Sequence, residues 1–104
     1  MINIYLDDVR PCPEGFVLAK TPEECMNLLR DNEVNILSLD HDIDFNLSRK
    51  TGYDVAMYII HKNKYPDIIY LHTSNPVGRD NMYRLLKVNA PLHIEIYPWA
   101  MRLK

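Results

Sequence analysis

Four groups of polar residues in this 104-residue chain each follow a short apolar stretch, and their types suit metal and phosphate chemistry. The groups are Asp7 and Asp8; Asp40, His41 and Asp42; His72, Thr73, Ser74 and Asn75; and Tyr97 and Pro98. Carboxylates that gather at one place repel each other unless a cation neutralises them, and oxygen ligands with spare water positions suit Mg²⁺ or Mn²⁺. If the fold brings the groups together, they form a small metal and phosphate site.

The apolar stretches read as strands. Residues 2–6 alternate between apolar and other side chains, residues 34–39 and 68–71 are nearly continuous apolar runs, and residues 92–97 alternate again. A shorter stretch, residues 16–19, is a fifth strand. Continuous apolar runs are typical of central strands covered on both faces, whereas alternation is typical of an edge strand with one wetter face.

Helices are predicted between these strands. Thr21 and Thr51 can each cap one, and a third carries apolar residues at helical spacing and ends before Pro91. Strands that alternate with helices predict a parallel sheet wrapped by helices, with right-handed crossovers. Because the carboxyl ends of parallel strands form one shared crevice, we expect the four polar groups to become neighbours.

Composition limits the classes of protein that the chain can belong to. Its length and its 47% hydrophobic content predict one domain, residues 1–104. The formal charge of −2 gives no global basic field for non-specific DNA binding. Cys12 and Cys25 are too few for a disulfide scaffold, which fits a reducing cytoplasm. No apolar run is long enough for a membrane span, so we expect a soluble, cytoplasmic protein with no membrane partner.

The order of the polar groups resembles the receiver domain of two-component signalling over nearly the whole chain. The acidic pair follows the first strand, Asp40 the third and Thr73 the fourth, while Tyr97 stands where receivers have a lysine. The resemblance implies an α/β fold of the flavodoxin or receiver type, a three-layer sandwich with a mostly parallel five-stranded sheet in the order 2-1-3-4-5. Two receiver helices are lacking, because residues 9–15 replace the first and too few residues remain for the last.

A closer resemblance is to the cyclic-phosphate processing receiver domains, since three separated motifs agree in order and spacing. The first is Leu-Asp-Asp-Val-Arg-Pro at residues 6–11, and the second is Ser-Leu-Asp-His-Asp at residues 38–42. The third is His-Thr-Ser-Asn-Pro-Val-Gly at residues 72–78, in which Thr73 replaces the family's serine. This resemblance implies a phosphate-containing ligand, such as the 2′,3′-cyclic phosphate end of an RNA or a cyclic nucleotide.

Receivers hold Mg²⁺ with the acidic pair, the central aspartate and a nearby carbonyl. The resemblance therefore implies Mg²⁺ (or Mn²⁺) on Asp7, Asp8, Asp40 and, through its backbone, Asp42. Opening a cyclic phosphodiester also needs a nucleophile and a proton for the departing oxygen. Metal-bound water and the Asp40 carboxylate are both candidate nucleophiles.

The remaining polar residues supply the other parts of such a reaction. His41 and His72 are the candidate acid and base, because imidazole titrates near neutral pH. Arg10 and Arg79 could grip phosphate with their planar donors. The candidates for further contacts with the phosphate or the substrate are Thr73, Ser74 and Asn75.

Simpler roles and other functions remain open. His41 could be a surface residue, His72 a hydrogen-bonded core imidazole, and the two arginines structural ion-pair partners. Besides a metal-dependent phosphoesterase in RNA repair or nucleotide metabolism, the chain could be a stand-alone receiver that accepts a phosphoryl group on Asp40. It could also be a degenerate receiver that acts only as a protein-interaction module, or a homodimer formed through apolar surface near Ile94 and Trp99.

Overall fold

The computed structural model describes residues 1–43 and 49–102, and the strands and helices alternate as the sequence predicts. The elements in chain order are β1 (Ile2–Leu6), β2 (Val17–Ala19), α1 (Pro22–Asp31), β3 (Val34–Leu39), α2 (Gly52–Lys62), β4 (Ile68–Leu71), α3 (Pro76–Asn89) and β5 (Glu95–Tyr97). The polar stretch between the third strand and the second helix is expected from the sequence to be a loop at residues 44–50, of which residues 44–48 lie outside the described residues. The first three polar groups of the sequence follow β1, β3 and β4, and the fourth begins with the last residue of β5, Tyr97.

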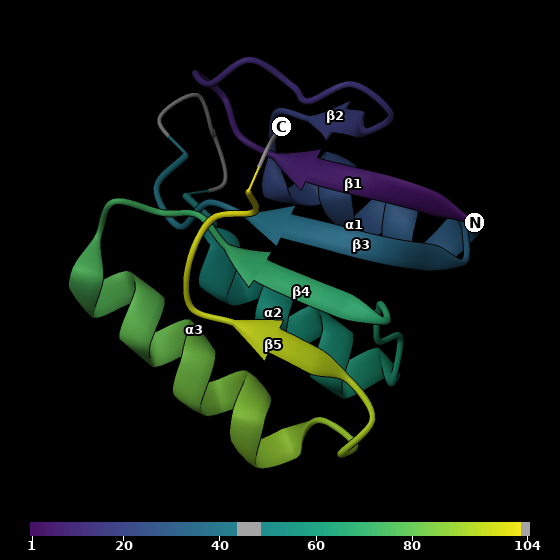
Figure 1. Cartoon of the computed structure of the whole chain (residues 1–104), viewed down its shortest axis with the longest axis vertical. Coiled ribbons are helices and arrows are strands. Elements are labelled where there is room, and N and C mark those ends of the chain that lie inside the picture. Colours follow the sequence, from purple (N-terminus) through teal and green to yellow (C-terminus); the bar gives the residue numbers. More distant parts are fainter. Residues whose placement is uncertain (44–48, 103–104) are drawn as a thin grey trace.

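The five strands form one sheet in the order β2-β1-β3-β4-β5, and every neighbouring pair is parallel. This confirms the predicted receiver-like α/β fold and its strand order. β3 lies between β1 and β4, so the carboxyl ends of these three strands are adjacent at one edge of the sheet (Figure 1). The connections that follow these three strands therefore meet at that edge.

Three helices occur in the described residues, and all three cover the same face of the sheet. The connections from β2 to β3, from β3 to β4 and from β4 to β5 all advance in the same direction across it. Right-handed crossovers in one direction place their helices on one face. In keeping with this, α2 packs against both α1 and α3. Figure 1 shows α1 and α2 behind the strands, with α3 near the β5 edge.

The opposite face has no helical layer among the described residues, so the molecule has two layers where the resemblance to receivers implied three. The connection from β1 to β2 runs in the reverse direction, and a right-handed helix there would cover this second face. Residues 9–15 form no helix, as expected from the sequence. Tyr5, Tyr70 and Tyr97 lie on this face of β1, β4 and β5; Tyr5 is buried there, and the other two are partly exposed.

Local sequence determines where each helix begins. The hydroxyl of Thr21 accepts a hydrogen bond from Glu24 N at 3.1 Å at the start of α1. Thr51 and Asp54 form a reciprocal capping box at the start of α2. In α3 the side chain of Asn75 accepts a hydrogen bond from Gly78 N at 3.0 Å. Each cap satisfies backbone donors that the first helical turn leaves unpaired.

The last strand is shorter than predicted. Residues 92–97 were expected to be extended, but β5 begins only at Glu95, and Leu92 and His93 form a turn. Ile94 N donates to the carbonyl of Pro91 at 3.1 Å, which closes this turn. Leu92 is consequently exposed whereas Ile94 is buried, so apolar alternation here came from a turn followed by a strand.

The core lies between the sheet and the helical layer. On the strands it contains Ile4, Leu6, Leu37, Leu39, Ile69 and Leu71, which pack with residues such as Leu29, Val55, Ile59, Met82 and Leu86 of the helices. These side chains fix the strand ends to which the polar groups are attached. Within residues 1–43 and 49–102, no helix has both the length and the apolar character that a membrane span requires.

Candidate functional site

Asp7 is the most heavily hydrogen-bonded carboxylate at the carboxyl edge of the sheet. Its Oδ1 atom accepts from the backbone N–H groups of Val9 at 2.8 Å and Arg10 at 2.9 Å. Its Oδ2 atom accepts from Arg10 Nη1 at 2.8 Å and from His72 Nε2 at 2.9 Å. Burial by itself would raise the pKa of Asp7, but the bonds donated by Arg10, Val9 and His72 outweigh it and lower this pKa. Asp7 is therefore a carboxylate at neutral pH.

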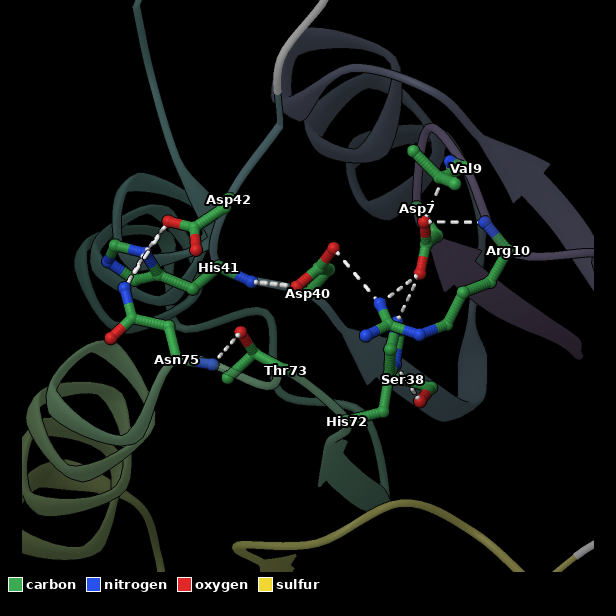
Figure 2. Close-up of polar contacts among 10 residues, drawn as sticks. All are labelled: Asp7, Val9, Arg10, Ser38, Asp40, His41, Asp42, His72, Thr73 and Asn75. Atoms are coloured by element: carbon green, nitrogen blue, oxygen red, sulfur yellow. Dashed lines mark hydrogen bonds and ion pairs between the residues drawn. The ribbon is translucent and has the colours of Figure 1, made fainter.

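Arg10 joins Asp7 to Asp40. The same Nη1 atom that contacts Asp7 lies 3.3 Å from Oδ2 of Asp40 (Figure 2). The side chains of both carboxylates are buried, whereas the Arg10 side chain is 39% exposed. The other oxygen of Asp40 accepts from the backbone N–H of His41 at 2.8 Å. Two buried carboxylates thus share one cation that reaches solvent.

His72 lies beneath Asp7 and is held at both ring nitrogens. Besides its bond to Asp7, its Nδ1 atom lies 2.6 Å from the Ser38 hydroxyl, and its ring stacks on Tyr5 with centroids 4.4 Å apart. Burial lowers the pKa of His72 below its usual 6.5, although Asp7 and Asp40 act in the opposite direction. The imidazole is therefore neutral at pH 7, with Nε2–H donating to Asp7 and Nδ1 accepting from Ser38.

A second group of polar residues adjoins Asp40 through the peptide bond to His41. The His41 Nδ1 atom lies 2.8 Å from Oδ1 of Asp42, and Asn75 Nδ2 donates to the same oxygen at 3.3 Å. The bond from His41, opposed by desolvation and aided by Asn75, lowers the pKa of Asp42. Thr73 is buried, and its hydroxyl accepts from Asn75 N at 3.1 Å. Figure 2 shows this group on one side of Asp40 and Arg10 on the other.

Two glycines allow the helices to approach the Asp40–His41 segment. A Cβ atom at Gly52 would lie 2.0 Å from the Asp40 carbonyl oxygen, and Gly52 N donates to the His41 carbonyl at 3.0 Å. A Cβ atom at Gly78 would lie 2.5 Å from Cγ of the His41 ring. Such distances are far inside van der Waals contact. The close fit of α2 and α3 around His41 therefore depends on both glycines.

The structure separates the predicted site residues into three sets. Asp7, Arg10, Asp40 and His72 form one hydrogen-bonded cluster, and His41, Asp42, Thr73 and Asn75 form the adjoining one. The others, Asp8, Ser74 and Arg79, lie beside these clusters in the chain. Asp8 is half-buried, Ser74 is exposed, and Arg79 N donates to the Asn75 carbonyl in the first turn of α3.

The roles of Ser38, Tyr5 and Gly52 emerge only from the structure. Two signals were available for Ser38: it opens the second family motif, and it is a serine inside the apolar run of residues 34–39 with the same strand orientation as Asp40 two residues later. Tyr97, which stands where receivers have a lysine, donates its hydroxyl hydrogen to Glu95 and stacks on Tyr70. The cation beside Asp40 is instead Arg10.

Comparison with known families identifies the chain. Residues 2–88 match the family model described as the cyclic-phosphate processing receiver domain. The chain belongs to this family. The match includes the segments that carry Asp7, Asp40 and His72, and it ends within α3. No curated protein and no solved structure matched the chain.

The carboxylates of this cyclic-phosphate processing receiver domain fit a divalent cation. Ligand atoms from Asp7, Asp40 and His72 all lie within 4.8 Å of one another. The Asp7 and Asp40 oxygens already share a positive charge, that of Arg10. His72 differs, because its Nε2 atom carries the proton bonded to Asp7 and so has no lone pair for a metal. It fits the role of a residue that orients a ligating carboxylate.

Proposed function

We propose that this protein binds the 2′,3′-cyclic phosphate end of an RNA or nucleotide and, with a divalent metal ion, opens it to a phosphate monoester. The observation that carries the proposal is the pair of buried carboxylates, Asp7 and Asp40, joined by the partly exposed guanidinium of Arg10. Carboxylates alone would repel a phosphate. A cation that reaches solvent at the same point gives the anion a partner, and membership of the cyclic-phosphate processing family supports this class of ligand.

Asp7, Asp8 and Asp40 would hold the metal, together with the backbone carbonyl of Asp42. When bound, Mg²⁺ or Mn²⁺ supplies a Lewis acid that neutralises charge on the phosphate oxygens. The Asp42 carboxylate has a different role, because it faces His41 and Asn75. In this proposal Arg10 leaves the carboxylate pair and donates to two phosphate oxygens, which its planar group can do in a bidentate manner.

His41 is the residue best placed to protonate the departing ribose oxygen. Its Nδ1 atom is bonded to Asp42, so a proton would be exchanged with the ligand through Nε2. In hydrolysis, water adds its oxygen to phosphorus, one phosphorus–ribose oxygen bond breaks, and that ribose oxygen takes a proton. The nucleophile is either water or, in a two-step reaction, the Asp40 carboxylate. His72 is buried and orients Asp7, so we assign it a positioning role.

A phosphoryl switch on Asp40 is the second candidate function. The site after β4 favours it, because Thr73 follows this strand as it does in receivers and is buried beside the same edge. The residue that ends the fifth strand argues against it, since Tyr97 is bonded to Glu95 and brings no positive charge. Incubation with acetyl phosphate or phosphoramidate separates the two functions. A long-lived phosphoprotein that is lost in Asp40→Asn would support the switch.

Binding of a nucleoside 2′,3′-cyclic monophosphate, measured by isothermal titration calorimetry with Mg²⁺, tests the proposed function. The expected result is saturable binding that is at least about tenfold weaker in Arg10→Gln, because a charge-assisted bond contributes about 1.5–3 kcal/mol. Arg84→Gln changes an exposed arginine on α3 and is the matched control. Binding that is equal in all three proteins would contradict the role of Arg10.

A further inference from the structure

The face of the sheet without a helix in the described residues carries an unbroken row of paired residues. Leu18 pairs with Tyr5, Tyr5 with Ser38, Ser38 with Tyr70, and Tyr70 with Tyr97. This row crosses all five strands. Since paired residues in parallel strands point to the same side, the three tyrosines share the face that no helix covers in the described part of the chain.

The carboxylate cluster forms the next row on the same face. Asp7, Asp40 and His72 each lie two residues beyond a member of the first row, namely Tyr5, Ser38 and Tyr70. Two residues along a strand span about 7 Å, and side chains two apart point to the same side. The contacts agree, because His72 stacks on Tyr5 and bonds to Ser38. The proposed phosphate site therefore lies next to the row of paired residues, on the same face of the sheet and toward the carboxyl ends of the strands.

Three aromatic rings at the β5 side of this row, those of Tyr70, Tyr97 and Trp99, contact one another in sequence and are accessible to solvent. Tyr70 and Tyr97 have ring centroids 5.2 Å apart at an interplanar angle of 28°, and Tyr97 and Trp99 have centroids 5.5 Å apart at 33°. Both tyrosines are partly exposed, and Trp99 is 58% exposed. Trp99 follows Tyr97, the last residue of β5, and its ring contacts that of Tyr97, so it lies at the carboxyl edge of the sheet, as the phosphate site does. Figure 1 shows the chain after β5 running across the carboxyl ends of the strands toward β1.

We propose that Trp99, supported by Tyr97 and Tyr70, is a stacking platform for the terminal bases of a single-stranded RNA whose cyclic phosphate lies at Arg10. This inference rests on the proposed function and specifies its substrate as an RNA end of more than one nucleotide. Every base has a flat aromatic face, so stacking on protein aromatics holds single-stranded RNA without demanding a sequence.

Charge favours RNA over a second copy of the chain as the occupant. Arg10, which follows β1 at the carboxyl edge, is a cation whose side chain is 39% exposed. It suits the terminal phosphate of an RNA, whereas a copy of this chain would bring another Trp99 and no phosphate. Trp99 is also the one aromatic side chain that is mostly exposed among the described residues. A single ring suits a base better than it suits a dimer interface.

The test uses Trp99 as its own reporter, because it is the only tryptophan in the sequence. Stopped-flow quenching of its fluorescence reads binding before turnover. The probes are a short RNA with a 2′,3′-cyclic phosphate end, the same RNA with a 3′-hydroxyl end, and an abasic oligomer that keeps the cyclic phosphate. Anisotropy of fluorescein-labelled probes gives the affinities of variants that lack the tryptophan. Leu92→Ala, which alters an exposed apolar residue outside the row, is the matched control.

We expect the cyclic-phosphate RNA to quench Trp99 and the abasic oligomer not to. Trp99→Ala should weaken binding of the RNA roughly ten- to hundredfold, which is the scale of one stacked base, and leave the abasic oligomer unaffected. Trp99→Phe should restore most of the affinity, whereas Leu92→Ala should change nothing.

Other results overturn one proposal or both. Equal affinities for RNA and abasic oligomer, unchanged in Trp99→Ala, would overturn the platform and leave the phosphate site in place. Trp99-dependent binding that ignores the end group would support the platform and overturn the proposed function. No binding of any probe would overturn both. A dimer that Trp99→Ala dissociates, with RNA affinity unchanged, would make this face an interface between chains and overturn the platform.

Discussion

The Nε2 atom of His72 lies 2.9 Å from the Oδ2 atom of Asp7, and both side chains are almost completely buried. The Ser38 hydroxyl occupies the other ring nitrogen, so the imidazole has one orientation and one tautomer. This arrangement joins β1, β3 and β4 beneath the candidate site. It makes His72 part of the structure that positions Asp7, and it couples the stability of the fold to pH.

Stability should fall as the pH falls below about 6.5. Burial lowers the folded-state pKa of His72 beneath its unfolded value of 6.5, so the unfolded chain binds this proton more readily. The stabilisation is complete above the unfolded pKa and is lost as the pH falls toward and through the folded pKa. One proton changes the free energy of unfolding by at most about 1.4 kcal/mol per pH unit.

Urea denaturation at several pH values measures this slope. His72→Asn should be less stable than the native protein at neutral pH and should show a shallower dependence between about pH 8 and pH 5. His93→Asn, at an exposed position in the turn before β5, is the control and should keep the native slope. A native slope in His72→Asn would show that another group carries the pH dependence.

Replacing Arg10 should have opposite effects on metal and on phosphate. Arg10 supplies the positive charge that Asp7 and Asp40 share, so Arg10→Gln leaves the carboxylates without this partner and should bind Mg²⁺ or Mn²⁺ more tightly. Thermal shift against metal concentration measures the gain, because a ligand that binds only the folded state raises the melting temperature. A smaller metal-induced shift in Arg10→Gln than in Arg84→Gln would mean that the metal does not use this pair.

Alanine at either glycine beside His41 should destabilise the protein, and the loss of stability should be larger at Gly52 than at Gly78. In Gly52→Ala the new methyl group meets backbone atoms of Asp40, which cannot rotate away, so we expect a loss of several kcal/mol or failure to fold. In Gly78→Ala it meets the His41 ring, which can turn at some cost, so we expect a loss of about 1–3 kcal/mol and a larger loss of activity.

Helix propensity alone predicts the reverse sign for Gly78→Ala, a gain of about 0.4–1 kcal/mol. Denaturant unfolding therefore distinguishes the two effects. Val77→Ala, at the neighbouring exposed position, is the control for a small change in the same turn. A Gly78→Ala protein that is more stable and fully active would show that His41 needs no contact with α3.

The meeting of the polar residues at the strand ends was predictable from the sequence, because one rule of parallel sheets places those ends together. Apolar runs indicated the strands, and parallel strands place their carboxyl ends at one edge, so Asp7, Asp40 and His72 could be expected to meet. Family motifs added the strand order, which periodicity alone does not provide. The resemblance also implied a second helical layer, but residues 9–15, which make the connection that would carry a helix to that face, form none.

What the sequence did not reveal depends on contacts between distant segments. The bond between Ser38 and His72 requires the register of β3 against β4, and residues 34–39 read simply as a buried strand. The need for glycine at position 52 arises from a carbonyl twelve residues away in the sequence. Residues 92–94 resemble a strand in sequence because two apolar residues, Leu92 and Ile94, are spaced like alternate strand positions. In the structure Leu92 is exposed in a turn and Ile94 is buried.

The central claim is that the carboxylate pair and Arg10 act on a cyclic phosphate. The most direct measurement is ³¹P NMR of a short RNA with a 2′,3′-cyclic phosphate end, incubated with the protein and Mg²⁺, with EDTA and Asp40→Asn as controls. We expect conversion of the cyclic resonance to that of a monoester only with native protein and metal. An unchanged resonance in that sample, or equal conversion by Asp40→Asn, would contradict it.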